Sequence, residues 1–258
     1  MPRRLLLAAC ALAFVPVIAS CGDDDDADAA SATASPTTSG QTGSTTGASN
    51  GASPTLSRPA SQVSVSIDDI GIAWLTDIAN TFVIDAATYG KQPMLFGNET
   101  EGNKLLTEWG YVEGYETAYI PEGRDTAVLK GSYYIKVETH LFKDAEGAGE
   151  AFKYFTQYAS TSGASPVNIE PVGNSSVAFA TSYGKIGGTN VNALYHQIVF
   201  RRGNVITIIL TKGAQGFMKV DSAWDLAVIA DEKLTGERPA VEPTPTSGYK
   251  TPTPAPKQ

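Results

Sequence analysis

Cys21 is the residue whose type and neighbours point most directly to chemistry in this chain of 258 residues. The small residues Ala19 and Ser20 precede it, and four aspartates, residues 23 to 26, follow after Gly22. A thiol can be alkylated to a stable thioether, and small side chains before it let an extended chain enter a peptidase site. The pattern therefore indicates that Cys21 is a site of covalent modification.

The residues before Cys21 have the layout of a secretory signal peptide. Arg3 and Arg4 give a positive start, a mostly apolar stretch covers residues 5 to 19, and small residues close it. The alternative is a membrane-spanning helix, which needs about 20 apolar residues, and Pro16 would interrupt a stretch that is already too short. We therefore predict a signal peptide over residues 1 to 20.

The four residues Ile18-Ala19-Ser20-Cys21 resemble the lipobox of bacterial lipoproteins. This resemblance implies that Cys21 receives a diacylglyceryl group, that the preceding peptide is removed, and that acyl chains such as palmitate hold the mature protein on the outer side of a membrane. The alternative is ordinary secretion with a free Cys21, in which Ile18 would occupy a position where a small residue is usual. Because Cys10 leaves with the signal peptide, no disulfide can form within the mature chain.

Composition divides the mature chain into one folded part between two tails. Residues 21 to 60 are rich in Ser, Thr, Gly, Ala and Asp and contain no aromatic residue, which predicts a disordered tether. Residues 238 to 258 are rich in proline, which favours an extended, disordered tail. The stretch 61 to 237 has the content of one globular domain. The aspartate run lacks the glycine and carbonyl spacing of a Ca²⁺ loop, so we interpret it as solvated.

The charge of the chain argues against one class of partner. The formal net charge is −8, and removal of Arg3 and Arg4 would leave 17 basic against 27 acidic residues, or −10. Nucleic-acid binding requires a basic patch, so no nucleic-acid partner is expected.

Residue patterns predict several helices and strands between residues 61 and 237. Helical spacing marks residues 67 to 81 and 103 to 109, and Asp144 and Asp221 begin two amphipathic helices. Five strands are expected over residues 113 to 120, 131 to 142, 176 to 183, 192 to 201 and 204 to 212. A tight hairpin at Arg202-Gly203 or Gly203-Asn204 joins the last two strands. The final strand is apolar at nearly every position, which predicts cover on both of its faces.

This order of elements predicts a single α+β domain, an antiparallel sheet with helices packed mainly on one face. The order, together with the string FRRGNV at residues 200 to 205, resembles lipoprotein domains of unknown function from Gram-positive and related bacteria. Some of those domains have the fold of the photosystem II protein PsbP. The resemblance implies no catalytic residue.

The two histidines of the mature chain were considered as metal ligands. His140 alternates with Lys136 and Glu138 on the solvent phase of its strand, whereas His196 is in phase with apolar residues. We therefore expect the two imidazoles to lie on opposite faces, without a zinc site.

Other motifs for catalysis are weak. No Gly-x-Ser-x-Gly string occurs between residues 61 and 237, and the glycines of residues 184 to 189 lack the spacing of a phosphate-binding loop. Glu113 and Glu116 could serve a glycosidase, but the sequence does not fix their separation. We predict no catalytic residue and no cofactor.

Aromatic residues are enriched before and within the first long strand. Trp109, Tyr111, Tyr115 and Tyr119 lie within eleven positions, and the three tyrosines share one phase of an extended strand. An exposed stripe of this kind would suit a flat apolar or sugar ligand, or a protein partner. Packing of a first strand into the core is the alternative. These four residues are the predicted binding site.

Together these patterns predict a membrane-anchored, extracytoplasmic lipoprotein with a non-enzymatic domain that binds a ligand or partner. One alternative is a hydrolase of envelope polymer, which would show two facing carboxylates about 5 to 10 Å apart. Another is a structural or chaperone-like accessory of a membrane complex, which would expose an apolar patch of several hundred Å². A deep apolar pocket would indicate ligand carriage instead.

Overall fold

A computed structural model of the chain describes residues 56–71, 73–123, 131–186 and 189–241. The predicted signal peptide, the lipobox with Cys21, and most of the predicted tether and tail lie outside these ranges. Within them, the helices and strands extend from Ala60 to Thr235. No helix in the described ranges is both long enough and apolar enough to cross a membrane.

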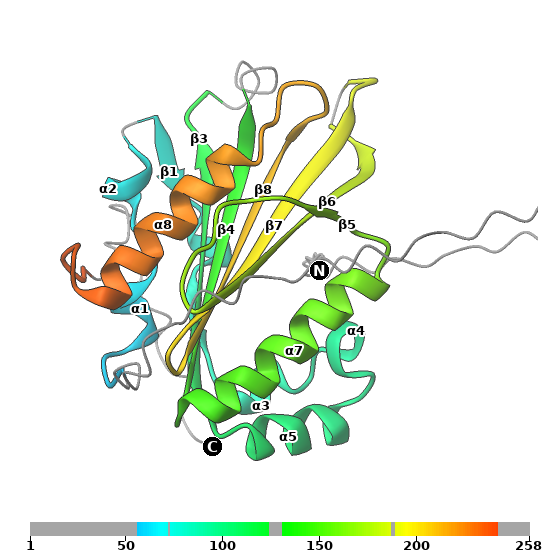
Figure 1. Ribbon diagram of the computed structural model, residues 1–258. Helices are drawn as coiled ribbons and strands as arrows, with labels where there is room; N and C mark the ends of the chain where they lie inside the picture. The colour runs from blue at the N-terminus through cyan, green and yellow to red at the C-terminus, as the bar shows by residue number, and fades with distance from the viewer. Residues whose placement is uncertain (1–55, 72, 124–130, 187–188, 242–258) are drawn as a thin grey trace, which may run out of the picture.

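The domain is built on one antiparallel sheet of eight strands (Figure 1). In order across the sheet its strands are β1 (Trp74–Thr76), β3 (Tyr111–Pro121), β4 (Ser132–Phe142), β8 (Val205–Ala214), β7 (Asn192–Arg202), β6 (Ser175–Lys185) and β5 (Ser165–Val167), while β2 (Phe82–Ile84) also pairs with β3. Gly203 and Asn204 form the short turn between β7 and β8, which confirms the second of the two predicted hairpins.

Two long helices lie on opposite faces of this sheet. On β7, Phe200 belongs to a buried cluster that includes Leu226 of α8 (Asp221–Thr235), whereas the adjacent Val199 belongs to a cluster that includes Phe155 of α7 (Ala145–Thr161). Successive side chains of a strand point to opposite faces, so the two helices cover different sides. We call these sides the α8 face and the α7 face.

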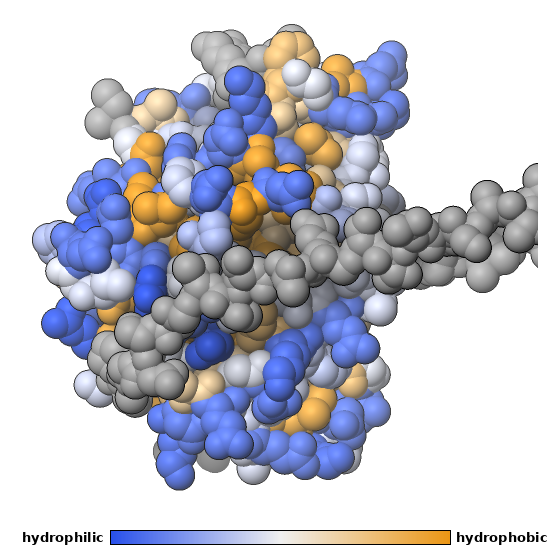
Figure 2. All heavy atoms as spheres, viewed as in Figure 1, coloured by the Kyte–Doolittle hydropathy of each residue, from blue (hydrophilic) through white to orange (hydrophobic). Residues whose placement is uncertain are grey.

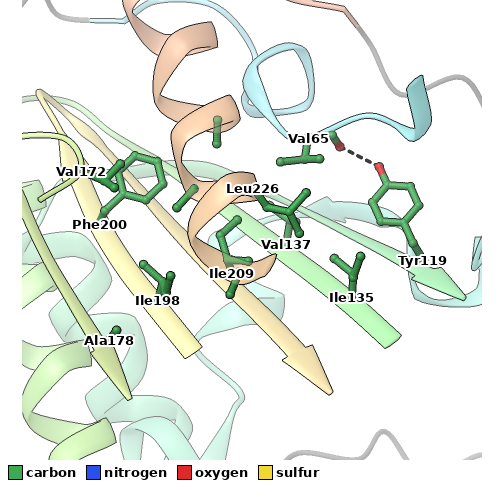
Figure 3. Close-up of a cluster of buried hydrophobic side chains, with 13 residues drawn as sticks. Val65, Tyr119, Ile135, Val137, Val172, Ala178, Ile198, Phe200, Ile209 and Leu226 are labelled. Atoms are coloured by element: carbon green, nitrogen blue, oxygen red, sulfur yellow. Dashed lines mark hydrogen bonds between the residues drawn. The ribbon is translucent and has the colours of Figure 1, made fainter. Parts of the chain in front are cut away.

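The α8 face carries the larger of the two main clusters, which also includes residues of β3, β4 and β8 (Figure 3). The helices α1 (Ala60–Val63) and α2 (Ile67–Ile70) lie beside α8. Their position is fixed in part by the Tyr119 hydroxyl, which donates a hydrogen bond of 2.7 Å to the carbonyl oxygen of Val65. This hydrogen bond links β3 to the segment between α1 and α2.

The α7 face is covered at one end of the strands by α7 and by three shorter helices. These are α3 (Ala86–Tyr89), α4 (Pro93–Phe96) and α5 (Glu99–Glu108). On β8, Ile206 packs toward them and Ile209 packs toward α8, which confirms that this strand is covered on both faces. The α+β class, the antiparallel sheet and the single domain are confirmed. The helices, expected mainly on one face, are instead divided between the two.

The predicted strands are confirmed within a few residues, but the chain before residue 111 differs from prediction. Residues 67 to 81 do not form one helix, because α2 ends at Gly71, whose φ of 108° favours glycine. The chain then forms β1, the 3₁₀ turn η1 (Ile78–Asn80) and β2. The helix predicted at residues 103 to 109 begins earlier, with Asn98 as its N-cap.

Candidate functional site

The α7 face is only partly covered, and its uncovered part is the candidate site. Burial of the side chains on this face decreases along two central strands. On β8, Ile206 is buried and Leu210 is half-buried, and on β7, Val199 is buried and Tyr195 is half-buried. We call this part the open half. Its half-buried side chains are Glu116, Tyr134, Lys136, Glu138, Tyr195, Gln197, Ile208, Leu210 and Lys212.

One end of the open half is hollowed beside the C-terminal end of α7. A small cavity of about 90 Å³ lies there, and Tyr158 of α7 and Phe179, Tyr195 and Leu210 of the sheet line it. Its lining is mostly apolar and aromatic, which suits a small flat group rather than a whole drug-sized ligand.

The other end of the open half carries a chain of ionisable side chains. Glu116 of β3 and Glu138 of β4 are directly opposite in the register of the two strands. The ammonium of Lys136 lies 2.5 Å from the Glu138 carboxylate and 3.4 Å from that of Glu116. Both carboxylate side chains are only 14% exposed. Like charges placed opposite each other destabilise a sheet, so the shared lysine is needed to hold this pair.

The chain continues inward through His140. Its Nε2 lies 3.2 Å from Glu138, and its Nδ1 lies 3.3 Å from the Tyr111 hydroxyl, which is also 3.3 Å from the carbonyl oxygen of Ile84. The ring of Tyr89 stacks on the imidazole with the ring centroids 4.6 Å apart. A connected polar path therefore leads from Glu116, at the edge of the open half, to a buried aromatic cluster.

The two glutamates differ in their acidity. Burial of the carboxyl and the negative charge of Glu138 raise the pKa of Glu116 to about 7. Burial also acts to raise the pKa of Glu138, but the charge of Lys136 and the hydrogen bond from His140 outweigh it and hold that pKa well below its usual range. Burial acts against the charged form of Lys136, yet the two carboxylates raise the pKa of this ammonium. The raised pKa lets the Glu116 carboxyl take up or release a proton near neutral pH.

A second hollow lies on the α8 face, between α8, α2 and the ends of β3 and β4. It is an open groove of about 800 Å³ with Trp74, Ile135, Leu226 and Phe217 among its apolar lining and with Asp69 and Asp225 among its polar lining. Figure 2 shows the α8 side of the molecule, where apolar residues are visible between polar ones. The groove is wide open, and no chain of polar groups comparable to that at Glu116 converges in it.

The four predicted aromatic binding residues do not form an exposed stripe. Trp109, Tyr115 and Tyr119 are buried, and Tyr111 is partly buried. A shift of register between Tyr111 and Glu113 reverses the phase of the strand, so Tyr111 packs on the α7 face whereas Tyr119 packs on the α8 face. Core packing, the alternative stated for these residues, is what the structure shows.

The predictions for the histidines are partly corrected. His140 was expected on the solvent face of its strand, but its side chain is fully buried, because α3 covers it and Tyr89 stacks on it. His196 is buried on the α8 face, so the two imidazoles lie on opposite faces as predicted. Among the residues that the structure describes, no group of three or more His, Cys, Asp or Glu is placed to hold a metal ion.

The carboxylates named as a possible glycosidase pair are also separated. Glu113 accepts a hydrogen bond of 2.8 Å from the backbone nitrogen of Ala60, at the start of α1, whereas Glu116 lies on the α7 face. The partner of Glu116 is Glu138, which sequence reasoning missed. The alternation of Lys136, Glu138 and His140 on one phase of β4 was the available signal, but it was interpreted as a solvated face.

Comparison with known proteins leaves the chain without a family. No family model matches it, and no curated protein matches it. Among solved structures, the extracellular domain of PknH from Mycobacterium tuberculosis is similar, with a TM-score of 0.43 and 10% sequence identity over 72% of this chain and 100% of that chain.

Proposed function

We propose that this protein is a membrane-anchored, extracytoplasmic lipoprotein whose domain binds a ligand or partner, without catalysis, through the open half of the α7 face. The observation that carries the proposal is the uncovered part of the sheet, where apolar and aromatic side chains adjoin the Glu116–Lys136–Glu138 chain. A binding surface typically combines such an apolar centre with a few placed charges.

The ionic chain differs from an ordinary solvated sheet face. Solvated charges on a sheet are separate and well exposed. They keep their water in the folded state, so folding carries no desolvation cost for them. Here two carboxylates are largely withdrawn from water and are opposite each other, which costs free energy that the fold alone does not require. Retention of such a chain at the margin of an open apolar surface supports a role in recognition.

The place where the tether joins the domain also supports this arrangement. The Asn204 side chain accepts a hydrogen bond of 2.7 Å from the Leu56 nitrogen and donates one of 3.0 Å to the Leu56 carbonyl oxygen. Asn204 lies in the β7–β8 turn, whereas Tyr195 and Leu210 lie farther along these strands, away from that turn. A lipid at Cys21 would therefore hold the domain by the end that is remote from the open half.

The test is capture of binding partners by the purified mature protein from solubilised envelope, compared between two charge insertions. Leu210→Glu places a charge in the open half, and Val83→Glu places one at an exposed position on a short edge strand facing the other side. We expect Leu210→Glu to reduce capture by about tenfold or more, because the new carboxylate must lose its water when a partner covers this apolar surface. Val83→Glu should capture as wild type does.

Circular dichroism would confirm that both variants are folded. Equal capture by Leu210→Glu and wild type, or loss of capture in Val83→Glu alone, would show that the open half is not the binding surface.

A hydrolase is the second candidate, because the pKa values of Glu116 and Glu138 move in opposite directions. One protonated and one ionised carboxyl on facing strands is the arrangement of a glycosidase acid and its partner. Lys136 lies between the two carboxyls, however, where a glycosidic bond would have to fit. Hydrolysis of purified envelope polymer by wild type, abolished in Glu138→Gln, would support this alternative against simple binding.

A further inference from the structure

Lys136 does not neutralise its two glutamates equally. Its ammonium lies 2.5 Å from Glu138 but 3.4 Å from Glu116, and His140 donates a further hydrogen bond to Glu138 alone. The Coulomb attraction falls with distance, and no other basic side chain pairs with Glu116 among the described residues. Glu116 is therefore the less compensated of the two carboxylates.

An exposed aromatic ring lies beside this carboxylate. Phe82 of β2 is directly opposite Glu116 in the register, so the two side chains share the α7 face. Phe82 remains 42% exposed, although Ile84, two residues along the same strand, is buried under α3. A carboxylate beside the accessible face of an aromatic ring is the combination that attracts ammonium and guanidinium groups.

The same surface already holds one cation against aromatic rings. The ammonium of Lys212 lies 5.1 Å from the centroid of the Tyr195 ring and 5.6 Å from that of Tyr133. The open half thus has a chemistry that accommodates organic cations. Lys136, the basic side chain that pairs with Glu116 among the described residues, comes from β4, whereas Phe82 lies on β2, on the other side of β3, and β2 carries no basic residue.

We propose, on the basis of the function proposed above, that the group recognised at the open half is an organic cation, a primary ammonium or a guanidinium. Its charge pairs with the Glu116 carboxylate, and its carbon chain lies against the Phe82 ring. Such a group is carried by a lysine or arginine side chain and by small amines, and both sources present the same chemistry.

Binding of this cation is linked to a proton on Glu116. The titratable groups that face or act on Glu116 are on β4, with two tyrosines behind them, and β2 contributes no charge. They are Glu138, Lys136, Tyr134 and His140 of β4, Tyr89 of α3 and Tyr111 of β3. With its pKa at about 7, Glu116 is largely protonated in mildly acidic solution and cannot pair with a cation. The cation should therefore bind more tightly as the pH rises through neutrality, and one proton should be released.

The experiment is an NMR titration of the full mature chain with three probes that share one backbone. Nα-acetyl-lysine amide and Nα-acetyl-arginine amide carry the two cations, and Nα-acetyl-norleucine amide is the neutral control. At about pH 8 the two cations should give saturable shifts of amide signals in β2, β3 and β4, and at about pH 5.5 their affinity should fall by about tenfold. The neutral probe should give no saturable shift.

Variants separate the parts of the site. Glu116→Gln should weaken binding of the cations by about tenfold at pH 8 and remove the pH dependence, and Phe82→Ala should weaken it by about threefold. Glu108→Gln changes an exposed carboxylate on α5 and should have no effect. The absence of a saturable shift, equal binding of the neutral probe, or unchanged binding in Glu116→Gln would overturn the proposal.

The outcomes distinguish this proposal from the function on which it rests. If Leu210→Glu abolishes partner capture while Glu116→Gln leaves capture intact, the result supports the proposed binding surface and contradicts the proposed recognition of a cation. If capture is indifferent to Leu210→Glu, the proposed function fails, and the titration still reports independently on the site at Glu116.

Discussion

At the scale of single residues, one buried ammonium joins the N-terminal helices to α8. The Lys233 side chain is 1% exposed, and its Nζ lies 2.5 Å from the Asp69 carboxylate and 3.1 Å from the Ser64 carbonyl oxygen. Arg238 approaches the same carboxylate at 3.5 Å. Burial acts to raise the pKa of Asp69, but its hydrogen bonds from Lys233 and Ser66 prevail and lower it. The pair therefore favours the folded state at neutral pH.

Replacement of this ammonium should be strongly destabilising. Lys233→Met keeps the length of the side chain but leaves the buried Asp69 carboxylate with Arg238, at 3.5 Å, as its nearest cation, beside its hydrogen bonds from Ser66. We expect the free energy of unfolding in urea to fall by about 3 to 5 kcal/mol. Lys104→Met removes an ammonium from a side chain that is 59% exposed. This variant should change the free energy of unfolding by less than about 0.5 kcal/mol. Similar costs for both variants would contradict the structural role of Lys233.

The carboxyl of Glu116 should make stability depend on pH in a direction opposite to most acids. Its pKa is about 7 in the folded protein against 4.5 for an ordinary glutamate, so between these values the folded state binds more protons than the unfolded state. Stability should therefore fall by about 2 to 3 kcal/mol as the pH rises from 4.5 to 7. Glu138 and Asp69, whose pKa values are lowered, act only at more acidic pH.

Glu116→Gln should remove this fall, because glutamine does not titrate. Urea unfolding at several pH values would measure the difference between wild type and variant across the window. If the two proteins show parallel pH profiles, the carboxyl of Glu116 is not held in the protonated form by the fold.

At the scale of elements, the crossing of α7 over the end of α5 is set by one glycine. A Cβ atom on Gly147 would lie 1.9 Å from the carbonyl oxygen of Trp109, whereas one on Gly149, two residues along the same helix, would meet nothing within 4 Å. Asp144 caps this first turn by accepting a hydrogen bond of 2.8 Å from the Gly147 nitrogen. The helix therefore begins at a fixed place and at the closest approach that a backbone allows.

This pair of glycines gives a matched test. Gly147→Ala should lower the free energy of unfolding by about 2 to 3 kcal/mol, because backbone atoms must move to admit the methyl group. Gly149→Ala should raise it by about 0.5 to 1 kcal/mol, because alanine has the higher helix propensity and open space around it. Thermal or urea unfolding would measure both. Equal effects of the two substitutions would mean that α7 does not contact Trp109 as closely as described.

The sequence predicted the long elements because their signals are local. Alternation of apolar and polar residues identified β4, a nearly continuous apolar run identified β8, and the apolar stripe after Asp144 identified α7. By contrast, residues 67 to 81 were predicted as partly helical, which α2 confirms at their start, but the prediction missed β1, since three-residue strands such as β1 and β2 are too short for a periodic pattern. Gly102 lies inside α5, where a Cβ would come within 2.3 Å of the Gly90 carbonyl oxygen. That requirement depends on tertiary packing.

The candidate site was largely hidden from the sequence for the same reason. Lys136, Glu138 and His140 lie on one phase of β4, and polar residues on one phase normally indicate solvent. The cover of His140 comes from Tyr89, about 50 residues earlier in the chain, and the pairing of Glu116 with Glu138 depends on the register of β3 and β4. The loop between these strands is long, so its length does not fix that register.

At the scale of the whole molecule, the first described residue lies at the end of the sheet that is remote from the proposed binding surface. The first described residue, Leu56, is held at the β7–β8 turn by Asn204, which also donates a hydrogen bond of 2.7 Å to the carbonyl oxygen of Phe142. Residues 21 to 55 would then separate Cys21 from this point. A flexible chain of that length spans roughly 35 Å on average, enough to clear lipid headgroups. A lipid at Cys21 would thus leave the open half free to meet its partner.

Removal of the Cys21 thiol should therefore change the location of the protein without changing its fold. Cys21→Ser cannot form a thioether and so cannot carry the lipid, and we therefore expect the variant in the soluble extracytoplasmic fraction. Cys10→Ala changes a residue that the signal peptide would carry away, and this variant should remain in the membrane fraction with wild type. Cell fractionation measures the location, and the intact mass of wild type should exceed that of the polypeptide from Cys21 by its acyl groups. Firm membrane binding of Cys21→Ser, together with an unmodified mass for wild type, would mean that the protein is held by a partner rather than by a lipid on Cys21.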